Sequence, residues 1–170
     1  SEGPVQPISL LHPAGTPVPL RRSGNELPSR VADNLFWLGR QAERAEGSAR
    51  VLRGILLRLT SELDAGAMPE LPLLLEVLAE MGDFRAQAKK NASPSWPAVE
   101  RELKAYVFDG NRPSSVRSTL NSLHRLASIV RDRISIDAWR VLNTVEQDFT
   151  APANLNGVQL ADVLSMLNQM

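Results

Sequence analysis

Charged side chains gather in one short stretch of the sequence, Arg40-Gln41-Ala42-Glu43-Arg44-Ala45-Glu46. Carboxylates and guanidinium groups three or four residues apart share one face of a helix and can form ion pairs there. Trp37 comes three residues before Arg40, a spacing that allows an indole to stack on a guanidinium. Glu43 and Glu46 stand at i and i+3, but the arginines around them favour an ion network over an acid-base pair. The stretch is therefore a candidate interaction site and not a catalytic one.

Two glycines, Gly39 and Gly47, stand four residues before and four residues after Glu43. A glycine inside a helix costs on the order of 1 kcal/mol relative to alanine, so a pair of them predicts a neighbouring backbone packed closely against this face. A carboxylate enclosed in that way needs a partner, and Arg40 and Arg44 are within reach. One interpretation is a buried ion-pair network that fixes helix register, and the other is a site that faces a ligand or partner. Exposure of Glu43 distinguishes the two.

The sequence offers few other groups for catalysis. Cysteine is absent, and the only histidines, His12 and His124, lie far apart, which is a poor basis for a zinc site or a catalytic triad. No glycine-rich phosphate loop and no serine nucleophile elbow occur. The segment Arg131-Asp132-Arg133 suits the solvated end of a helix, and Arg131 is kept as a further member of the candidate site. We expect no catalytic residue, no metal and no cofactor bound by this chain.

Composition narrows the class of protein. A length of 170 residues with 43% apolar content suits one domain with a real core. The 19 basic residues equal the 19 acidic ones, so overall charge gives no reason to expect nucleic acid as a partner. No signal-peptide pattern and no run of about 20 apolar residues appears, which argues against export and against a membrane span. The absence of cysteine agrees with a reducing cytoplasm.

Apolar periodicity predicts an all-α fold, an antiparallel bundle of about five to six helices. The first helix, with Ser29 as its N-cap, is expected to be long, because apolar residues alternate steps of four and three along it. These residues are Val31, Leu35, Leu38, Ala42, Ala45, Ala49, Leu52, Leu56, Leu59 and Leu63. Further helices are expected over about 71–89, 97–108, from Ser114 or Ser115 to about 134, from Ser135 to 149, and over 158–167. The fourth, which repeats the four-three pattern, is the expected antiparallel partner of the first.

The amino-terminal segment reads differently. Residues 1–28 hold six of the twelve prolines and show no helical period, which predicts an extended arm. The apolar residues of this arm would have nothing to bury against in isolation, so residues 1–26 are interpreted as a linker or the tail of a preceding domain. An arm packed on the chain's own bundle is the alternative.

Two stretches resemble the alpha-E family, a bacterial family described as helical with a nearly invariant Glu-Arg pair. The first is LPSRVADNLFWLGRQAERAEGSARVL, in which Glu43-Arg44 matches the pair, and the second is NRPSSVRSTL followed by VRDRISIDAWRVLN. The resemblance covers most of residues 27–149 and assigns residues 27–170 to an alpha-E-like domain. The leader SLLHPAGTPVPLRRSGNELPSR also resembles the tail of circularly permuted ATP-grasp proteins, which in some bacteria are fused to an alpha-E domain.

The resemblance implies a non-catalytic accessory or interaction module in a cytoplasmic system for peptide synthesis or modification. Its implied partners are an ATP-grasp domain, in cis or in trans, and transglutaminase-like and peptidase proteins, and self-association stays open. ATP and magnesium are implied for the ATP-grasp domain only. The alternatives are a subunit that completes an active site with the Glu43-Arg44 face and a purely structural oligomerisation bundle.

This sequence departs from the family pattern in two places. Family members commonly repeat the Glu-Arg unit further on, and we expect that copy to be absent here, as in a truncated domain. They also commonly carry an Ala-Arg-Glu-Asn-Ala-Arg string where this chain reads Leu123-His124-Arg125-Leu126-Ala127-Ser128. A polar site shared between these two helices is therefore expected to be degenerate.

Overall fold

The computed structural model describes residues 27–61, 68–82, 84, 95–150, 152 and 154–170. Six α-helices occur in this part of the chain, and none of its residues lies in a strand. They are α1 (Ser29–Leu59), α2 (Glu70–Met81), α3 (Trp96–Phe108), α4 (Val116–Ile129), α5 (Ile136–Asp148) and α6 (Leu160–Asn168). The predicted all-α bundle with a long first helix is confirmed. The predicted extended arm, residues 1–26, lies outside the described residues.

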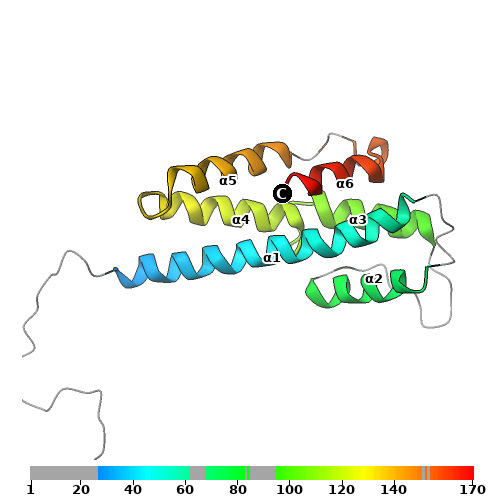
Figure 1. Ribbon diagram of the computed structural model, residues 1–170, viewed down its shortest axis with the longest axis horizontal. Helices are drawn as coiled ribbons and strands as arrows, with labels where there is room; N and C mark the ends of the chain where they lie inside the picture. The colour runs from blue at the N-terminus through cyan, green and yellow to red at the C-terminus, as the bar shows by residue number, and fades with distance from the viewer. Residues whose placement is uncertain (1–26, 62–67, 83, 85–94, 151, 153) are drawn as a thin grey trace, which may run out of the picture.

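Helix α1 is the spine of the bundle. Its 31 residues span about 46 Å at 1.5 Å per residue. Helix α4 runs antiparallel along it, as predicted, while α2 lies on another side of α1 and only along its carboxy-terminal half (Figure 1). Helix α6 also packs on α1, α5 packs on α4, and α3 packs on α4 and α6. The amino-terminal half of α1 therefore has fewer neighbours than the rest of the helix.

The core lies around the carboxy-terminal half of α1. Every buried residue of this helix falls between positions 45 and 56: Ala45, Ser48, Ala49, Leu52, Ile55 and Leu56. Of the predicted seam, Val31, Leu35 and Leu38 are only partly buried, and Ala42 is exposed. The seam residues in the first half of α1 are therefore less buried than most of those in its second half. The four-three spacing correctly indicates which face turns inward, but burial also needs a neighbour on that face.

Serine side chains begin two of the helices as predicted. The Ser115 hydroxyl accepts a hydrogen bond from the amide of Ser118 at 3.0 Å and donates one to the carbonyl of Asp109 at 2.6 Å. At α5 the Ser135 hydroxyl accepts from the amide of Ala138 at 3.0 Å. Helix α1 differs from the prediction, since its cap is Pro28 and Ser29 is already helical. A side-chain oxygen before a helix satisfies one of its free amide groups, which explains why these starts are readable from sequence.

Helix α2 is shorter than predicted, because it ends at Met81 and not near Lys89. The next residue, Gly82, is extended, with φ of −165° and ψ of −166°. A Cβ atom at Gly82 would stand 2.7 Å from the Tyr106 hydroxyl oxygen and 2.9 Å from Cβ of Ser114. Only glycine fits this close approach without a shift of its neighbours. Gly82, directly after the last residue of α2, thus packs against Tyr106 and Ser114.

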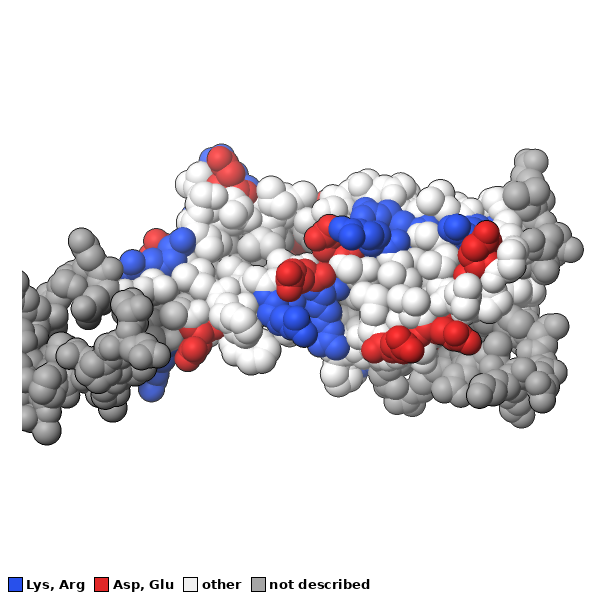
Figure 2. Space-filling model, turned by 60° about the horizontal axis from the view of Figure 1, so that its bottom comes forward, with Lys and Arg blue, Asp and Glu red and all other residues white. Residues whose placement is uncertain are grey.

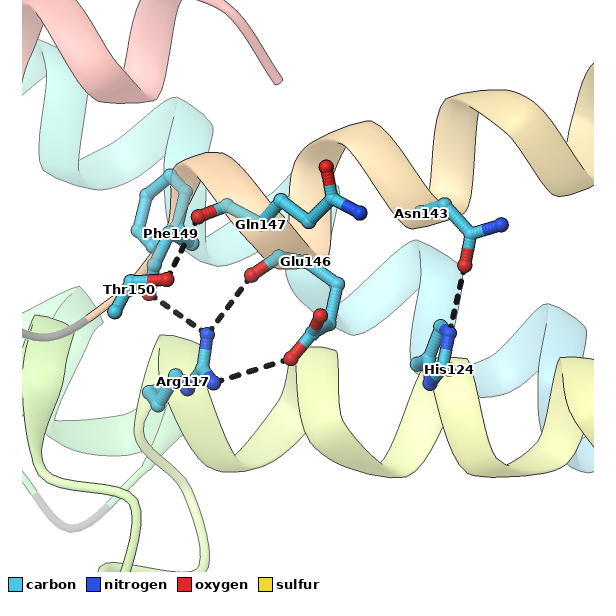
Figure 3. Close-up of polar contacts among 7 residues, drawn as sticks. All are labelled: Arg117, His124, Asn143, Glu146, Gln147, Phe149 and Thr150. Carbon is cyan, nitrogen blue, oxygen red and sulfur yellow. Dashed lines mark hydrogen bonds and ion pairs between the residues drawn. The ribbon is translucent and has the colours of Figure 1, made fainter.

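One arginine fixes the carboxy-terminal end of α5 on the amino-terminal end of α4 (Figure 3). Nη1 of Arg117 donates to the backbone carbonyls of Glu146 at 3.0 Å and Phe149 at 2.8 Å, and Nη2 donates to Oε1 of Glu146 at 3.1 Å. The last carbonyls of a helix have no partner within the helix, so a guanidinium group here satisfies two of them and matches the negative end of the helix dipole. Phe149, beside them, is buried in the core.

Candidate functional site

The predicted Glu-Arg stretch lies beside an open hollow on the surface of the bundle. The hollow has a volume of about 480 Å³ and is lined by Trp37, Arg40, Gln41, Glu43 and Arg44 of α1 and by Met81 of α2. Figure 2 shows basic and acidic side chains side by side near the middle of the face that α1 and α2 form. Four of the six predicted site residues, Trp37, Arg40, Glu43 and Arg44, are thus brought together.

The end of α2 creates this hollow. The side-chain methyl of Met81 lies 3.2 Å from the position that a Cβ atom would take at Gly47. About two turns back along α2, the side chain of Leu74 lies 3.8 Å from the Cβ position at Gly54. Glycine at these two positions allows α2 to lie close to α1 up to Met81. Beyond Met81, the charged residues on the same side of α1, Arg40, Glu43 and Arg44, are exposed.

Glu43 is exposed, which contradicts the interpretation of a carboxylate buried between close backbones. No atom outside the local helix lies within 4 Å of the Cβ position at Gly39, so only one of the two glycines marks a close approach. That approach comes from the side chain of Met81 and not from a backbone. The buried ion-pair network predicted for Glu43 is therefore wrong, because α2 ends before it could cover this carboxylate.

The charges in the hollow have no partner within the described residues. Arg40, Glu43 and Arg44 form none of the ion pairs or side-chain hydrogen bonds found there. Arginines elsewhere are engaged, for example Arg112 with Glu102 at 2.8 Å. Exposed charges in water cost little to the fold when they are unpaired, and they stay available to an incoming charged group.

Glu46 belongs to a different side of α1. Its carboxylate pairs with Arg50 one turn further along the helix, and both side chains are mostly exposed. Glu46 does not line the hollow. This pair is an exposed i,i+4 contact of the kind that adds only a few tenths of a kcal/mol, about 0.3–0.5, to helix stability. Glu46 was predicted as a site residue from its spacing alone. In the structure it lies outside the hollow that Glu43 lines.

Trp37 stands between two hollows. Its indole packs edge-on against Phe36, with ring centroids 5.5 Å apart, and the side chains are 52% and 65% exposed. The predicted stacking of Trp37 on Arg40 is not among the cation-π contacts of the described residues, which involve Arg112 and Arg131. A second hollow of about 340 Å³ is lined by Asn34, Trp37 and Gln41 of α1 and Ser122, Arg125 and Leu126 of α4. Two apolar rings left in water mark a contact surface.

Arg131 has a partner of its own away from the hollow. Its guanidinium carbon lies 5.2 Å from the centroid of the Trp139 ring, and the His124 ring stacks on the same indole at 5.3 Å. Nε2 of His124 is 2.8 Å from Oδ1 of Asn143 (Figure 3). His124 is partly buried, as predicted for a surface histidine. These contacts hold the α4–α5 turn together, and Arg131 does not line either hollow.

The residues that line the hollow indicate which interactions it can support. Among the described residues that line the Glu43-Arg44 hollow, none is a nucleophile with a neighbouring base. Among the described residues, no group of three or more His, Asp or Glu side chains is placed to hold a metal ion. In the same part of the chain, no helix has the length and apolar character needed to cross a bilayer. The hollow can instead offer two guanidinium groups, a carboxylate and an indole face to a partner.

Several residues that line these hollows were not predicted as site residues, among them Met81 and Arg125. Met81 lies within the helix expected over about 71–89, and that expectation gave no sign that the residue would border the site. Arg125 lies in the segment where the family string is replaced, and it lines the same hollow as Trp37. Figure 1 shows that α4, which carries Arg125, runs back along α1. The position of residue 125 could have been inferred from the predicted antiparallel pairing of the first and fourth helices, because that pairing places it opposite the amino-terminal half of α1.

Comparison with known proteins identifies the family. Residues 27–170 match the Alpha-E family, described as a predicted alpha-helical domain with a conserved ER motif, and the chain belongs to this family. Over 127 residues it is 30% identical to the uncharacterized proteins Rv2567 of Mycobacterium tuberculosis and Mb2597 of Mycobacterium bovis. The match covers 69% of this chain and 14% of each relative, so the chain spans about a seventh of their length. No solved structure matches the chain significantly.

The sequence contains two Glu-Arg dipeptides, Glu43-Arg44 and Glu100-Arg101, and their environments differ. Oε1 of Glu100 forms an ion pair with Nζ of Lys104 at 2.6 Å, and that lysine is buried. Glu43-Arg44 lines the open hollow and has no such partner within the described residues. The structure therefore distinguishes a pair engaged within α3 from a pair that remains available at the surface of α1.

Proposed function

We propose that this Alpha-E domain is a non-catalytic interaction module of an ATP-grasp-associated system for peptide synthesis or modification, and that it acts in the cytoplasm. The observation that supports this most is the open hollow in which Arg40, Glu43 and Arg44, which have no ion-pair partner among the described residues, lie beside the exposed indole of Trp37. Charged groups with an aromatic anchor are typical of surfaces that recognise another protein. The proposed partner is an ATP-grasp domain, in cis or in trans.

The relatives support a multidomain setting. Their segment similar to this chain is only 14% of their length. The resemblance of residues 9–30 to the tail of circularly permuted ATP-grasp proteins fits the same setting. In that chemistry a carboxylate is activated by ATP as an acyl phosphate and captured by an amine, and ATP and magnesium would belong to the ATP-grasp domain. Transglutaminase-like and peptidase proteins are further proposed members of the system.

Binding to the partner tests the proposal. The chain is titrated by calorimetry into the ATP-grasp protein encoded beside or fused to it in its source organism. We expect saturable binding that Glu43→Lys and Arg44→Glu each weaken by at least about tenfold, because each change places a like charge against the partner. Arg101→Glu, an exposed change on α3 with the same charge difference as Arg44→Glu, is the control and should bind normally. Absence of binding by the unmodified chain contradicts the proposal.

A second candidate function shares this surface, a subunit that completes the partner's active site with Glu43 and Arg44. The exposed carboxylate of Glu43 is the observation in its favour, since a general base must reach substrate. Ligase turnover at a saturating concentration of the Glu43→Gln chain separates the two. An interaction module restores full turnover once the partner is saturated, whereas a missing catalytic carboxylate leaves turnover low.

A further inference from the structure

One face of the amino-terminal half of α1 is open to solvent along its whole length. It is defined by Arg30, Asp33, Phe36, Trp37, Arg40 and Glu43, and we name it the open face of α1. All six side chains are exposed. Apart from the contact between the two aromatic rings, none of them has an ion pair, hydrogen bond or ring contact within the described residues. These residues repeat at steps of three and four, so they share one side of the helix.

The open face continues the side of α1 on which α2 packs. Leu74 and Met81 of α2 contact α1 at Gly54 and Gly47. Toward the amino-terminal end of α1, further steps of seven residues, each a three and a four, lead from Gly47 to Arg40 and Asp33 on the same side. A helix therefore already lies against this side of α1 as far as Met81. Beyond that point about 15 residues of α1, roughly 22 Å at 1.5 Å per residue, offer the same side without a cover. The geometry suits one further helix, placed end to end with α2.

The order of charges on the open face indicates which helix fits. Read from the amino-terminal end, the face runs basic, acidic, aromatic, aromatic, basic, acidic. Turned end to end, the same order places acid against base at every charged position. Arg30 then faces Glu43 of a second copy, and Asp33 faces Arg40, each pair occurring twice by symmetry. A parallel arrangement would instead place every charge against itself, which is unfavourable.

We propose that the open face of α1 is a self-association surface, on which α1 of a second copy of this chain packs antiparallel about a two-fold axis between Phe36 and Trp37. Residues whose numbers add to 73 face each other in this pairing. Phe36 and Trp37, which are 65% and 52% exposed in the single chain, form the centre and become covered by the same two rings of the partner. The four ion pairs flank this aromatic centre.

This proposal goes beyond the proposed function, since it concerns a second copy of this chain and needs no ATP-grasp protein. The contact is short, because only about four turns of helix take part, and interfaces below about 1,200 Å² of total buried surface are typically weak. The expected dimer therefore forms and dissociates reversibly, with the monomer dominant at low concentration. Reversible pairing would cover Glu43 in the dimer and release it in the monomer.

Sedimentation equilibrium of the 170-residue chain over a wide concentration range tests the proposal. We expect a monomer–dimer equilibrium that Asp33→Arg and Arg40→Asp each weaken by at least about tenfold, because two ion pairs become like-charge contacts. The double variant Asp33→Arg, Arg40→Asp restores opposite charges and should dimerise within about threefold of the unmodified chain. Asp148→Arg and Arg101→Asp, exposed positions away from α1, are the matched controls and should leave the equilibrium unchanged.

Several outcomes would overturn the proposal. A chain that stays monomeric throughout the range has no self-association surface of this kind. A dimer that the two single changes leave intact uses another face. Asp33 faces Arg44 when the helices are shifted by two residues on each chain. The proposed register would therefore be contradicted if dimerisation were restored by combining Asp33→Arg with Arg44→Asp, but not by combining it with Arg40→Asp. Circular dichroism of every variant, which should match the unmodified chain because all changes are exposed, separates lost association from lost folding.

Discussion

The side-chain methyl of Met81 lies 3.2 Å from the Cβ position of Gly47, whereas the Cβ position of Gly39, two helical turns earlier, has no atom outside the local helix within 4 Å. The two glycines looked equivalent in the sequence. In the structure one of them receives the end of α2, and the other faces solvent. This difference leads to the first prediction.

Gly47→Leu should lower the free energy of unfolding by about 1–3 kcal/mol, because the larger side chain displaces Met81 and overpacks the contact with α2. Gly39→Leu should leave it unchanged or raise it by up to about 1 kcal/mol, since leucine favours helix and meets nothing there. Urea unfolding followed by circular dichroism measures both. Equal effects of the two changes would contradict a contact specific to Gly47.

Glu43→Gln should change the free energy of unfolding by less than about 0.5 kcal/mol, as expected for an exposed side chain that forms no ion pair with a described residue. This reverses the expectation for a buried carboxylate, whose loss would leave arginine charge uncompensated. Thermal and urea unfolding provide the measurement. A loss of about 2 kcal/mol or more would mean that the carboxylate has a structural partner after all.

Glu102→Gln is the matched control for that experiment. Glu102 receives a hydrogen bond from Nη2 of Arg112 at 2.8 Å, and this arginine is mostly buried and lies 5.3 Å from the centroid of the Tyr106 ring. Removing the charge leaves a desolvated guanidinium without its counter-ion, so a loss of about 1–3 kcal/mol is expected. The same substitution should therefore be harmless at position 43 and costly at position 102.

Mg-ATP should show no saturable binding to this chain by calorimetry, and the chain alone should show no ATP-dependent ligation with any amine donor. The sequence has no glycine-rich phosphate loop, and among the described residues no acidic cluster is placed to hold a metal ion. Micromolar binding would contradict the proposal that ATP chemistry belongs to a partner domain. A saturating response at millimolar concentration only would reflect general anion binding to exposed arginines.

The helices and two of their caps could be predicted because their signals are local. Ser115 and Ser135 satisfy amide groups three residues away, and no distant contact is needed to recognise them. The end of α2 could not be predicted, since it depends on Gly82 meeting Tyr106 and Ser114, which lie more than 20 residues further along the chain. The expected helix, over about 71–89, continued past that point.

The candidate site shows the same division. Helical spacing correctly placed Trp37, Arg40 and Arg44 around one surface. Spacing says which residues share a face, but not whether another element covers that face. Enclosure of Glu43 was expected from the glycines on either side of it, and of the two only Gly47 has a side chain of another helix beside it. Arg131 was included in the candidate site because of its charge alone. In the structure it lies at the α4–α5 turn, where its guanidinium stacks on the Trp139 ring.

Arg117→Lys should lower the free energy of unfolding by about 1–3 kcal/mol, although it keeps the positive charge. Two nitrogens of the guanidinium reach three acceptors at once, the carbonyls of Glu146 and Phe149 and the carboxylate of Glu146. A single ammonium group cannot reproduce this forked geometry, and the carbonyls at the end of α5 would lose a partner. The loss should be local, because Arg117 touches only the carboxy-terminal end of α5 in these contacts. Hydrogen exchange should therefore rise first in α5 and around Phe149, while α1 stays protected.

Arg140→Lys is the matched control, since Arg140 forms only an exposed pair with Asp137 at 3.2 Å, and its replacement should cost less than about 0.5 kcal/mol. An Arg117→Lys chain as stable as the parent would show that charge alone at this position, and not the fork, holds α5 on α4.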